Sequence, residues 1–358
     1  MEQSETTTQT AGGLMYYFVV ANFCSIIYSF FLLKDFKIKK QSIYIWLYIC
    51  FFVVALICDT FHLSGLSDLI YISTPLFSLY VVYIYSRTHT LDISFHTSIF
   101  IGFLILCIQY LQIYNISNLF YKAHLTVAYY PMYFFPLVML NPNKRLRVIA
   151  TFIILLVIVS SIKRGGILSF SLGLIAYLFV QQRNDNKSNT KKLFILIITI
   201  AVATAIVLYL ITLLQSNIFD RFASISSDGG SNRIPLWKHV ITMISKSNVY
   251  DFIIGHGHNS VVAHNYLYGV SAHNDFLEIQ YDYGFISFVL YISAFAGFII
   301  KTRKLIKEKS QYAPTIAMMS VMYFIMSNIS VIVIYFQFIY VMIFYAIVIG
   351  QTENNGQK

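Results

Sequence analysis

One short segment, SAHNDFLEIQYDYG at residues 271–284, combines residue types that carry out acid–base chemistry. It holds an imidazole at His273 and carboxyl groups at Asp275, Glu278 and Asp282, where a polar segment gives way to an apolar one. A neutral imidazole within reach of a hydroxyl group can remove its proton, and a carboxylate can orient that imidazole. Because charges are costly at the mouth of a membrane span, they indicate a functional site. For the carboxylates, the alternative is that they are N-terminal helix charges favoured by the dipole.

A second motif, SSIKRGG, places Arg164 between two apolar runs of about 15 to 17 residues. At 1.5 Å per residue such helices reach only about 22 to 26 Å across a core of roughly 30 Å. The turn should therefore lie below the outer surface, where a cation costs on the order of 3 kcal/mol unless it is paired. Gly165 and Gly166 permit close backbone approach, and the next helix points its N–H groups at a bound anion. The motif predicts a phosphate cradle, with a snorkelling arginine as the alternative.

A third motif, SNRIPLWKHVITMIS, predicts an interfacial helix that begins near Arg233. Asn232 can cap this helix and Pro235 falls in its first turn, where no donor is required. Its positive N-terminus disfavours Arg233 unless an anion bridges the two. We expect it to lie flat on the membrane. The apolar face would consist of Leu236, Trp237, Val240, Ile241 and Ile244.

The only long loop predicted, residues 216–273, is rich in histidine. His258, His264 and His273 are each followed by asparagine, and His256 completes an HGH sequence. Four histidines and a neighbouring carboxylate could ligate Zn²⁺, but no spacing matches HExxH or another ligand pair carried by a helix. We therefore expect no metal and no cofactor, and we expect hydrogen bonding within the loop from the histidines other than His273.

Composition identifies the class of protein. With 58% hydrophobic and 11% charged residues, and with apolar runs of about 20 recurring along the chain, a soluble domain is excluded. We predict an all-α polytopic membrane protein, with the single integral domain 1–358 and about 11 transmembrane helices. The predicted spans lie near 13–33, 42–58, 66–86, 97–114, 118–140, 148–162, 165–181, 193–215, 274–300, 312–330 and 333–350.

The charges of the loops predict the orientation. Most of the 25 Lys and Arg residues fall in alternate short loops, such as KDFKIKK and KTRKLIKEK, which the positive-inside rule places in the cytoplasm. The N-terminus is then outside and the C-terminus cytoplasmic. No basic soluble face is predicted, so the net charge of +10 does not indicate nucleic-acid binding. The cysteines Cys24, Cys50, Cys58 and Cys107 show no paired spacing and suggest no disulfide framework.

The ordered motifs SSIKRGG, NRIPLW, IIGHG and AHNDFLEIQYDYGFIS, over roughly residues 148–300, resemble the O-antigen ligase and polymerase (Wzy-type) family. These are bacterial polyprenyl-diphosphate-dependent membrane glycosyltransferases. The resemblance implies a GT-C-like fold, with the loop 216–273 on the periplasmic side between helices 8 and 9, covering the active site. It also implies a location in the inner membrane, a glycan donor linked to undecaprenyl diphosphate, and no metal ion.

The resemblance also implies roles for particular residues. Arg164 and Arg233 would hold the diphosphate, together with Gly165 and Gly166, and His273 would act on the acceptor hydroxyl. Supporting or sugar-binding roles fall to Asn274, Asp275 and Glu278. This sequence departs from the family pattern at Lys163, where a small polar residue is usual, and at the extra His-Asn pair of His264, which offers a second register for the base. No D-x-D sequence occurs, so a metal-held nucleotide sugar is a poor candidate donor.

Three functions remain open from the sequence. The chain could polymerise lipid-linked repeat units of O-antigen or another surface polysaccharide, which we favour. It could instead be the related ligase that moves polymer onto a lipid anchor, as in lipopolysaccharide. A flippase without chemistry is the third, and it predicts charges buried at mid-bilayer and internal repeats. A chain-length regulator is a further candidate partner, beside the membrane lipid and the lipid-linked oligosaccharide.

Overall fold

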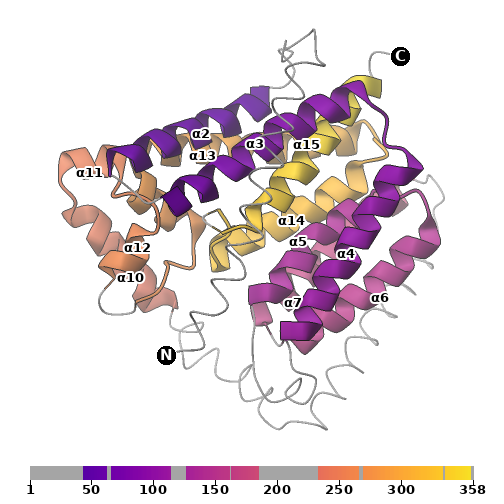
Figure 1. Cartoon of the computed structure of the whole chain (residues 1–358), viewed down its shortest axis with the longest axis horizontal. Helices are drawn as coiled ribbons and strands as arrows, with labels where there is room; N and C mark the ends of the chain where they lie inside the picture. The colour runs from indigo at the N-terminus through magenta and orange to yellow at the C-terminus, as the bar shows by residue number, and fades with distance from the viewer. Residues whose placement is uncertain are drawn as a thin grey trace.

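The structure is a computed structural model that describes residues 43–62, 66–113, 126–161, 163–184, 233–265, 269–333 and 335–355. Over these ranges the chain forms helices and no strand, as the sequence predicts. Five of the described helices are long and apolar enough to cross a membrane, and two shorter ones are also apolar. The chain is therefore an all-helical polytopic membrane protein (Figure 1).

The described helices follow the predicted spans closely. Two predicted spans, near 13–33 and 193–215, lie outside the described residues, and the span 118–140 is described only from the 3₁₀ turn η3 (Thr126–Ala128) onward. The other helices in the membrane-spanning bundle are α2 (Ile43–Phe61), α3 (Leu66–Thr88), α4 (Ile93–Ile113), α5 (Tyr129–Val138), α6 (Lys144–Ser160), α7 (Arg164–Asn184), α13 (Asp275–Lys307), α14 (Ala313–Ile329) and α15 (Phe338–Asn355).

The helices pack in pairs that are distant in sequence: α3 on α15, α7 on α14 and α2 on α13. Small residues lie at these contacts, as is common where helices associate in lipid. A Cβ at Gly350 of α15 would lie 2.9 Å from the backbone oxygen of Tyr83 on α3. On α7, Ser169 donates a hydrogen bond of 3.2 Å to the backbone oxygen of Met322 on α14. These close contacts hold the ends of the helices in register.

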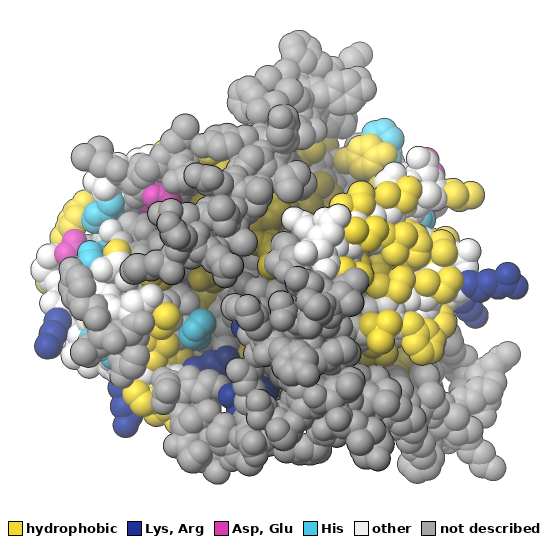
Figure 2. All heavy atoms as spheres, turned by 60° about the horizontal axis from the view of Figure 1, so that its bottom comes forward, with side chains coloured by type: hydrophobic (Ala, Val, Ile, Leu, Met, Phe, Trp, Pro, Cys, Tyr) yellow, Lys and Arg dark blue, Asp and Glu magenta, His cyan; other side chains and the backbone are white. Residues whose placement is uncertain are grey.

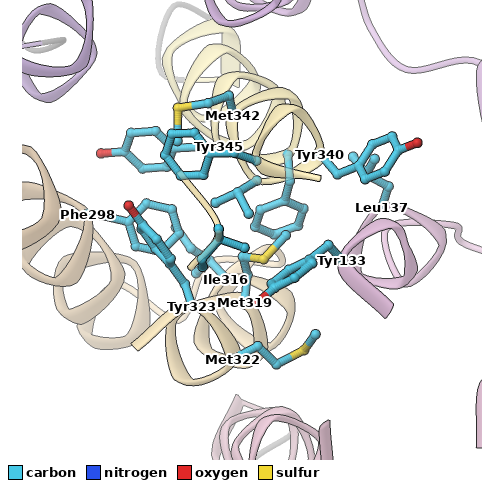
Figure 3. Close-up of a cluster of buried hydrophobic side chains, with 14 of the residues drawn as sticks. Tyr133, Leu137, Phe298, Ile316, Met319, Met322, Tyr323, Tyr340, Met342 and Tyr345 are labelled. Carbon is cyan, nitrogen blue, oxygen red and sulfur yellow. The ribbon is translucent and has the colours of Figure 1, made fainter. Parts of the chain in front are cut away.

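The core of the bundle is rich in aromatic side chains from α5, α13, α14 and α15 (Figure 3). Within it, the hydroxyl groups of Tyr48, Tyr323 and Tyr291 form a chain, with O–O distances of 3.4 and 2.9 Å. The Tyr291 hydroxyl then donates to Oδ2 of Asp275 at 3.1 Å. Because buried phenol groups usually need a partner, this chain satisfies three of them and links the core to the first residue of α13.

A kink at Gly284 divides α13 into two segments. Gly284 has φ 77 and ψ 179, and Gly255 faces it from the loop with φ 95. A Cβ on either glycine would clash with the backbone around the other, so only glycine fits at both positions. We call residues 275–284 the α13 head and residues 285–307 the α13 body.

Three loop helices pack beside the α13 head: α10 (Arg233–Lys246), α11 (Val249–Ile254) and α12 (Ser260–His264) (Figure 1). The predicted helix after Arg233 is confirmed as α10. Two of its five apolar residues, Leu236 and Val240, are buried against Val261, Ala272 and Tyr281 in a second apolar cluster. Part of the face expected to meet the membrane is therefore used to pack the loop onto α13.

The lengths of α6 and α7 correct one expectation. The expected length of 15 to 17 residues holds for α6, which has 17, but α7 has 21 because it begins at Arg164 and continues through the polar QQRN sequence. At 1.5 Å per residue, α7 reaches about 31 Å, enough to cross the core. The length of α7 therefore does not force Arg164 below the surface.

The outer faces of α4 and α6 are apolar. Hydrophobic side chains gather on the right of Figure 2, the side where Figure 1 places these helices. Phe152 and Leu156 of α6, and Ile101 and Ile105 of α4, are exposed. Exposed apolar surface of this extent fits contact with lipid.

Candidate functional site

The first part of the site is the turn between α6 and α7. Lys163 precedes α7, Arg164 is its first residue, and both are partly buried. A Cβ at Gly166 would lie 3.1 Å from Cε1 of Tyr129, and one at Gly165 would lie 2.9 Å from Cδ1 of Ile329. The two glycines thus let the start of α7 lie closely against η3–α5 and the end of α14. Their contribution to an anion site is the helix N-terminus itself, whose first N–H groups have no partner within the helix.

The second part is Arg233, the partly buried first residue of α10. Its guanidinium group lies within electrostatic reach of both the imidazole of His273 and the hydroxyl group of Tyr129. Because the ring of Tyr129 also packs against Gly166, the beginning of α10 lies close to the beginning of α7. Two helix N-termini and their cations therefore converge from segments about 70 residues apart in the chain.

The third part is His273, which connects the long loop to α13. Burial, and then the charges of Arg233 and Lys163, hold the pKa of the His273 imidazole below its ordinary value of 6.5. Each of these effects disfavours the imidazolium form, so the ring is neutral at pH 7 and can accept a proton. The backbone of His273 has φ 51, a left-handed conformation that is uncommon outside glycine. Such strain persists only where the surrounding structure fixes it, and it clusters at functional sites.

Asn274 fixes the backbone directly after His273. It is the N-cap of α13, and its Oδ1 accepts hydrogen bonds from the backbone N–H groups of Phe276 at 3.0 Å and Leu277 at 3.1 Å. Its Nδ2 donates to the backbone oxygen of Asn328 at the end of α14, at 3.3 Å. The role that these bonds show for Asn274 is to position the chain, and its role as a sugar ligand stays a prediction.

The carboxylates of Asp275 and Glu278 are fully buried. Asp275 Oδ1 accepts from the backbone N–H groups of Ile332 at 2.7 Å and Val333 at 3.2 Å, and so holds the α14–α15 connection. Glu278 Oε2 accepts from the backbone N–H of Ala272, the residue before His273, at 2.6 Å. Both carboxylates therefore hold backbone segments next to His273, and their predicted sugar-binding role is not supported by any of these contacts.

Asp282 and Asp59 hold the histidine loop in the same way. Asp282 accepts from the backbone N–H groups of Asn259 at 3.0 Å and Val261 at 2.9 Å. Asp59, near the end of α2, accepts from the backbone N–H of His258 at 2.9 Å. Two buried carboxylates thus satisfy donors of a turn that no regular structure would satisfy.

The other histidines of the loop were expected to bond within it, but their rings mainly contact tyrosines of α13 and α3. His256 stacks on the ring of Tyr281 with centroids 4.1 Å apart, and its Nδ1 lies 3.0 Å from the Tyr281 backbone oxygen. His264 Nδ1 lies 3.0 Å from the Tyr281 hydroxyl group, and the ring of His258 stacks on Tyr71. His264 is exposed and tied to this aromatic group, which leaves His273 as the histidine beside the cations.

Across the described ranges, no group of three or more His, Cys, Asp or Glu side chains is placed to hold a metal ion. Three of the four cysteines, Cys50, Cys58 and Cys107, lie in the described residues and are free thiols.

Sequence reasoning missed two residues of the site. The motifs give Lys163 no role beyond a departure from the family pattern and a basic charge outside the cytoplasmic set, yet its charge acts on His273. Tyr129 carried no motif, but it contacts Gly166 and lies within electrostatic reach of Arg233. A signal for Lys163 was available, since it is one of the few basic residues outside the cytoplasmic set. No local pattern identifies Tyr129.

Comparison with known families gives a match, which covers the segment that holds the cations of the site and His273. A family model described as O-Antigen ligase (Wzy_C) matches residues 149–292. The matched segment runs from α6 into the α13 body and contains Arg164, Arg233 and His273. No curated protein matches the chain. The match supports the family of surface-polysaccharide ligases and polymerases, in a multi-pass membrane protein.

Proposed function

We propose that this chain transfers a glycan from a polyprenyl diphosphate to a sugar hydroxyl group. One observation carries the proposal. The positive charges of Arg233 and Lys163, at two separate helix N-termini, both lower the pKa of one partly buried imidazole, that of His273. Arg164 follows Lys163 directly as the first residue of α7. A cluster of cations is stable in a partly buried site when an anion completes it.

The donor's diphosphate would be that anion. Arg164 and Arg233 would hold its oxygens through paired N–H bonds, which the planar guanidinium group provides and a lysine does not. The N-termini of α7 and α10 add their N–H groups and dipoles. As the bond from the anomeric carbon to the phosphate oxygen breaks, negative charge grows on the leaving diphosphate, and these groups stabilise it. The proposal assigns this task to side chains and needs no metal ion.

The acceptor hydroxyl group would meet His273. Its oxygen forms the new bond to the anomeric carbon, and its proton passes to the neutral imidazole. A positioned base of this kind contributes about 10²- to 10⁴-fold to the rate. The same cations that hold the diphosphate lower the pKa of His273, so one cluster serves both the leaving group and the base.

Among the possible acceptors, we propose a second lipid-linked repeat unit, which makes the enzyme an O-antigen or surface-polysaccharide polymerase. The donor would be linked to undecaprenyl diphosphate, and the reaction would take place on the outer face of the inner membrane. A ligase that transfers finished polymer to a lipid anchor is the second candidate, favoured by the description of the matching family. A flippase is less well supported, because the cations of the site gather at helix N-termini at one end of the bundle.

The glycan profile of cells that lack this protein tests the proposal. Single repeat units attached to the lipid anchor are expected of a missing polymerase, and unattached polymer would indicate a ligase. Complementation with the wild-type chain should restore the profile, whereas complementation with the His273→Ala variant should not. An unchanged profile in the deletion strain would contradict both enzyme functions.

A further inference from the structure

The short helix α11 carries an unusual set of exposed side chains. Of its six residues, Val249 is 76% exposed and Tyr250 is 56% exposed, and Phe252 and Ile253 are exposed as well. Its polar residue Asp251 is only partly exposed, and its Oδ2 lies 3.7 Å from Nε2 of the partly buried His256 and accepts a hydrogen bond from Asn248 Nδ2 at 2.7 Å. This is the reverse of the arrangement expected for a loop helix in water, which buries its apolar side.

The helix α11 is held firmly at the kink of α13. The rings of Phe252 and Phe285 are stacked, with centroids 5.7 Å apart and an angle of 18° between their planes. Gln280 Nε2 donates to the backbone oxygen of Phe252 at 3.3 Å. Gly255, directly after α11, contacts Gly284 through the backbone. The exposed residues of α11 therefore have a fixed position relative to the membrane-spanning helix.

The helix α11 lies beside one end of the exposed apolar face of the α13 body, the end at the kink. Below the kink, the α13 body exposes Phe285, Val289, Ile292 and Ile300, which recur every three to eight residues along one face. The apolar part of the body, residues 285–300 before the basic KTRKLIK sequence, is about 24 Å long, most of a hydrocarbon core of roughly 30 Å. The kink thus falls near the edge of the core, and the α13 head, with its buried carboxyl groups, extends about 15 Å further along the helix.

We propose that α11 is embedded in the membrane interface, with Val249, Tyr250 and Ile253 among the lipids. The surface continues without a break from the α13 body, through the Phe252–Phe285 stack, onto α11. Tyrosine is enriched at the level where acyl chains meet headgroups, which fits Tyr250. On α10, for which the sequence suggested membrane contact, Leu236 and Val240 pack against protein, whereas Ile241 stays exposed.

Spin labels in lipid nanodiscs test this placement on the full chain. Single cysteines are introduced as Val249→Cys on α11, Val289→Cys on the α13 body and Ser245→Cys on the exposed side of α10, after the four native cysteines are replaced. Collision of each label with oxygen, which enters lipid, and with a water-soluble nickel complex gives its environment. The labels at 289 and 245 are matched controls for lipid and for water, respectively.

The oxygen-to-nickel collision ratio at 249 is expected to be severalfold higher than at 245 and to approach that at 289. A ratio at 249 equal to that at 245 would show α11 in water and overturn the proposal. A label at 249 that neither reagent reaches would show a protein contact, from a second copy or a partner, and would overturn it as well. The measurement uses no substrate, so its outcome is independent of the proposed glycosyl transfer.

Discussion

Basic groups lie on one side of His273 and carboxyl groups on the other, and the structure uses the two sides in different ways. On one side, Lys163, Arg164 and Arg233 are partly buried at helix N-termini. On the other side, the carboxylates of the α13 head, Asp275 among them, are fully buried and accept hydrogen bonds from backbone N–H groups.

The difference separates binding from positioning. A cation at a helix N-terminus is opposed by the helix dipole, and a bound anion would offset that opposition. The carboxyl groups of Asp275 and Asp282 each accept two backbone N–H bonds from the protein itself. We therefore propose that the basic side binds the substrate, while the acidic side holds the backbone around His273.

The largest effect is expected at the arginines. Arg164→Lys or Arg233→Lys should lower the rate of chain extension about 100-fold, because a lysine cannot offer two parallel N–H bonds to a phosphate. The measurement is extension of lipid-diphosphate repeat units by the purified variants. Arg183→Lys, at the other end of α7, is the matched control and should behave as the wild type. Full activity in both site variants would leave only general charge as the explanation.

A smaller effect, on stability, is expected at Asp282. The Asp282→Asn variant can accept only one of the two backbone hydrogen bonds and turns an N–H₂ donor toward the other N–H group. The free energy of unfolding should fall by about 2 kcal/mol or more. Denaturant unfolding in detergent measures this, with the exposed Glu308→Gln as a control that should change little. Lost activity with unchanged stability would instead place Asp282 among the functional residues.

The smallest effect is expected on the pH profile. Removing the charge of Lys163 by Lys163→Gln makes the His273 imidazolium less unfavourable, so the pKa of His273 should rise toward its ordinary value. Because the neutral ring is the active form, the acid limb of the kcat/KM profile should move to higher pH. The control is Lys238→Gln, at an exposed residue of α10, which should leave the acid limb in place. An unmoved acid limb in the Lys163→Gln variant would show that Lys163 does not act on the base.

Much of the fold could be predicted from the sequence, because each membrane span depends mainly on its own apolar residues. The spans expected near 42–58 and 66–86 are observed as α2 and α3, and the helix after Arg233 is observed as α10. The kink of α13 was not predicted, because it depends on Gly255 facing Gly284 across nearly 30 residues. Hydropathy reports the length of an element and not its tertiary partners.

For the site, sequence motifs identified the side chains but not their environments. Arg233 and His273 share one electrostatic environment, and that residue pair was expected from the ordered motifs. The predicted roles of Asp275 and Glu278 followed from their closeness in sequence to His273. Their hydrogen bonds could not be predicted. The bond from Val333 to Asp275 joins segments far apart in the chain, and the bond from Ala272 to Glu278 depends on the turn before α13.

The most direct test is the His273→Ala variant in nanodiscs, with donor binding and chain extension measured on the same sample. If the cations bind the diphosphate and His273 only accepts the proton, the variant should bind the lipid-diphosphate donor nearly as tightly as the wild type does. Extension should then be at least about 100-fold slower. Extension at the wild-type rate would contradict the account.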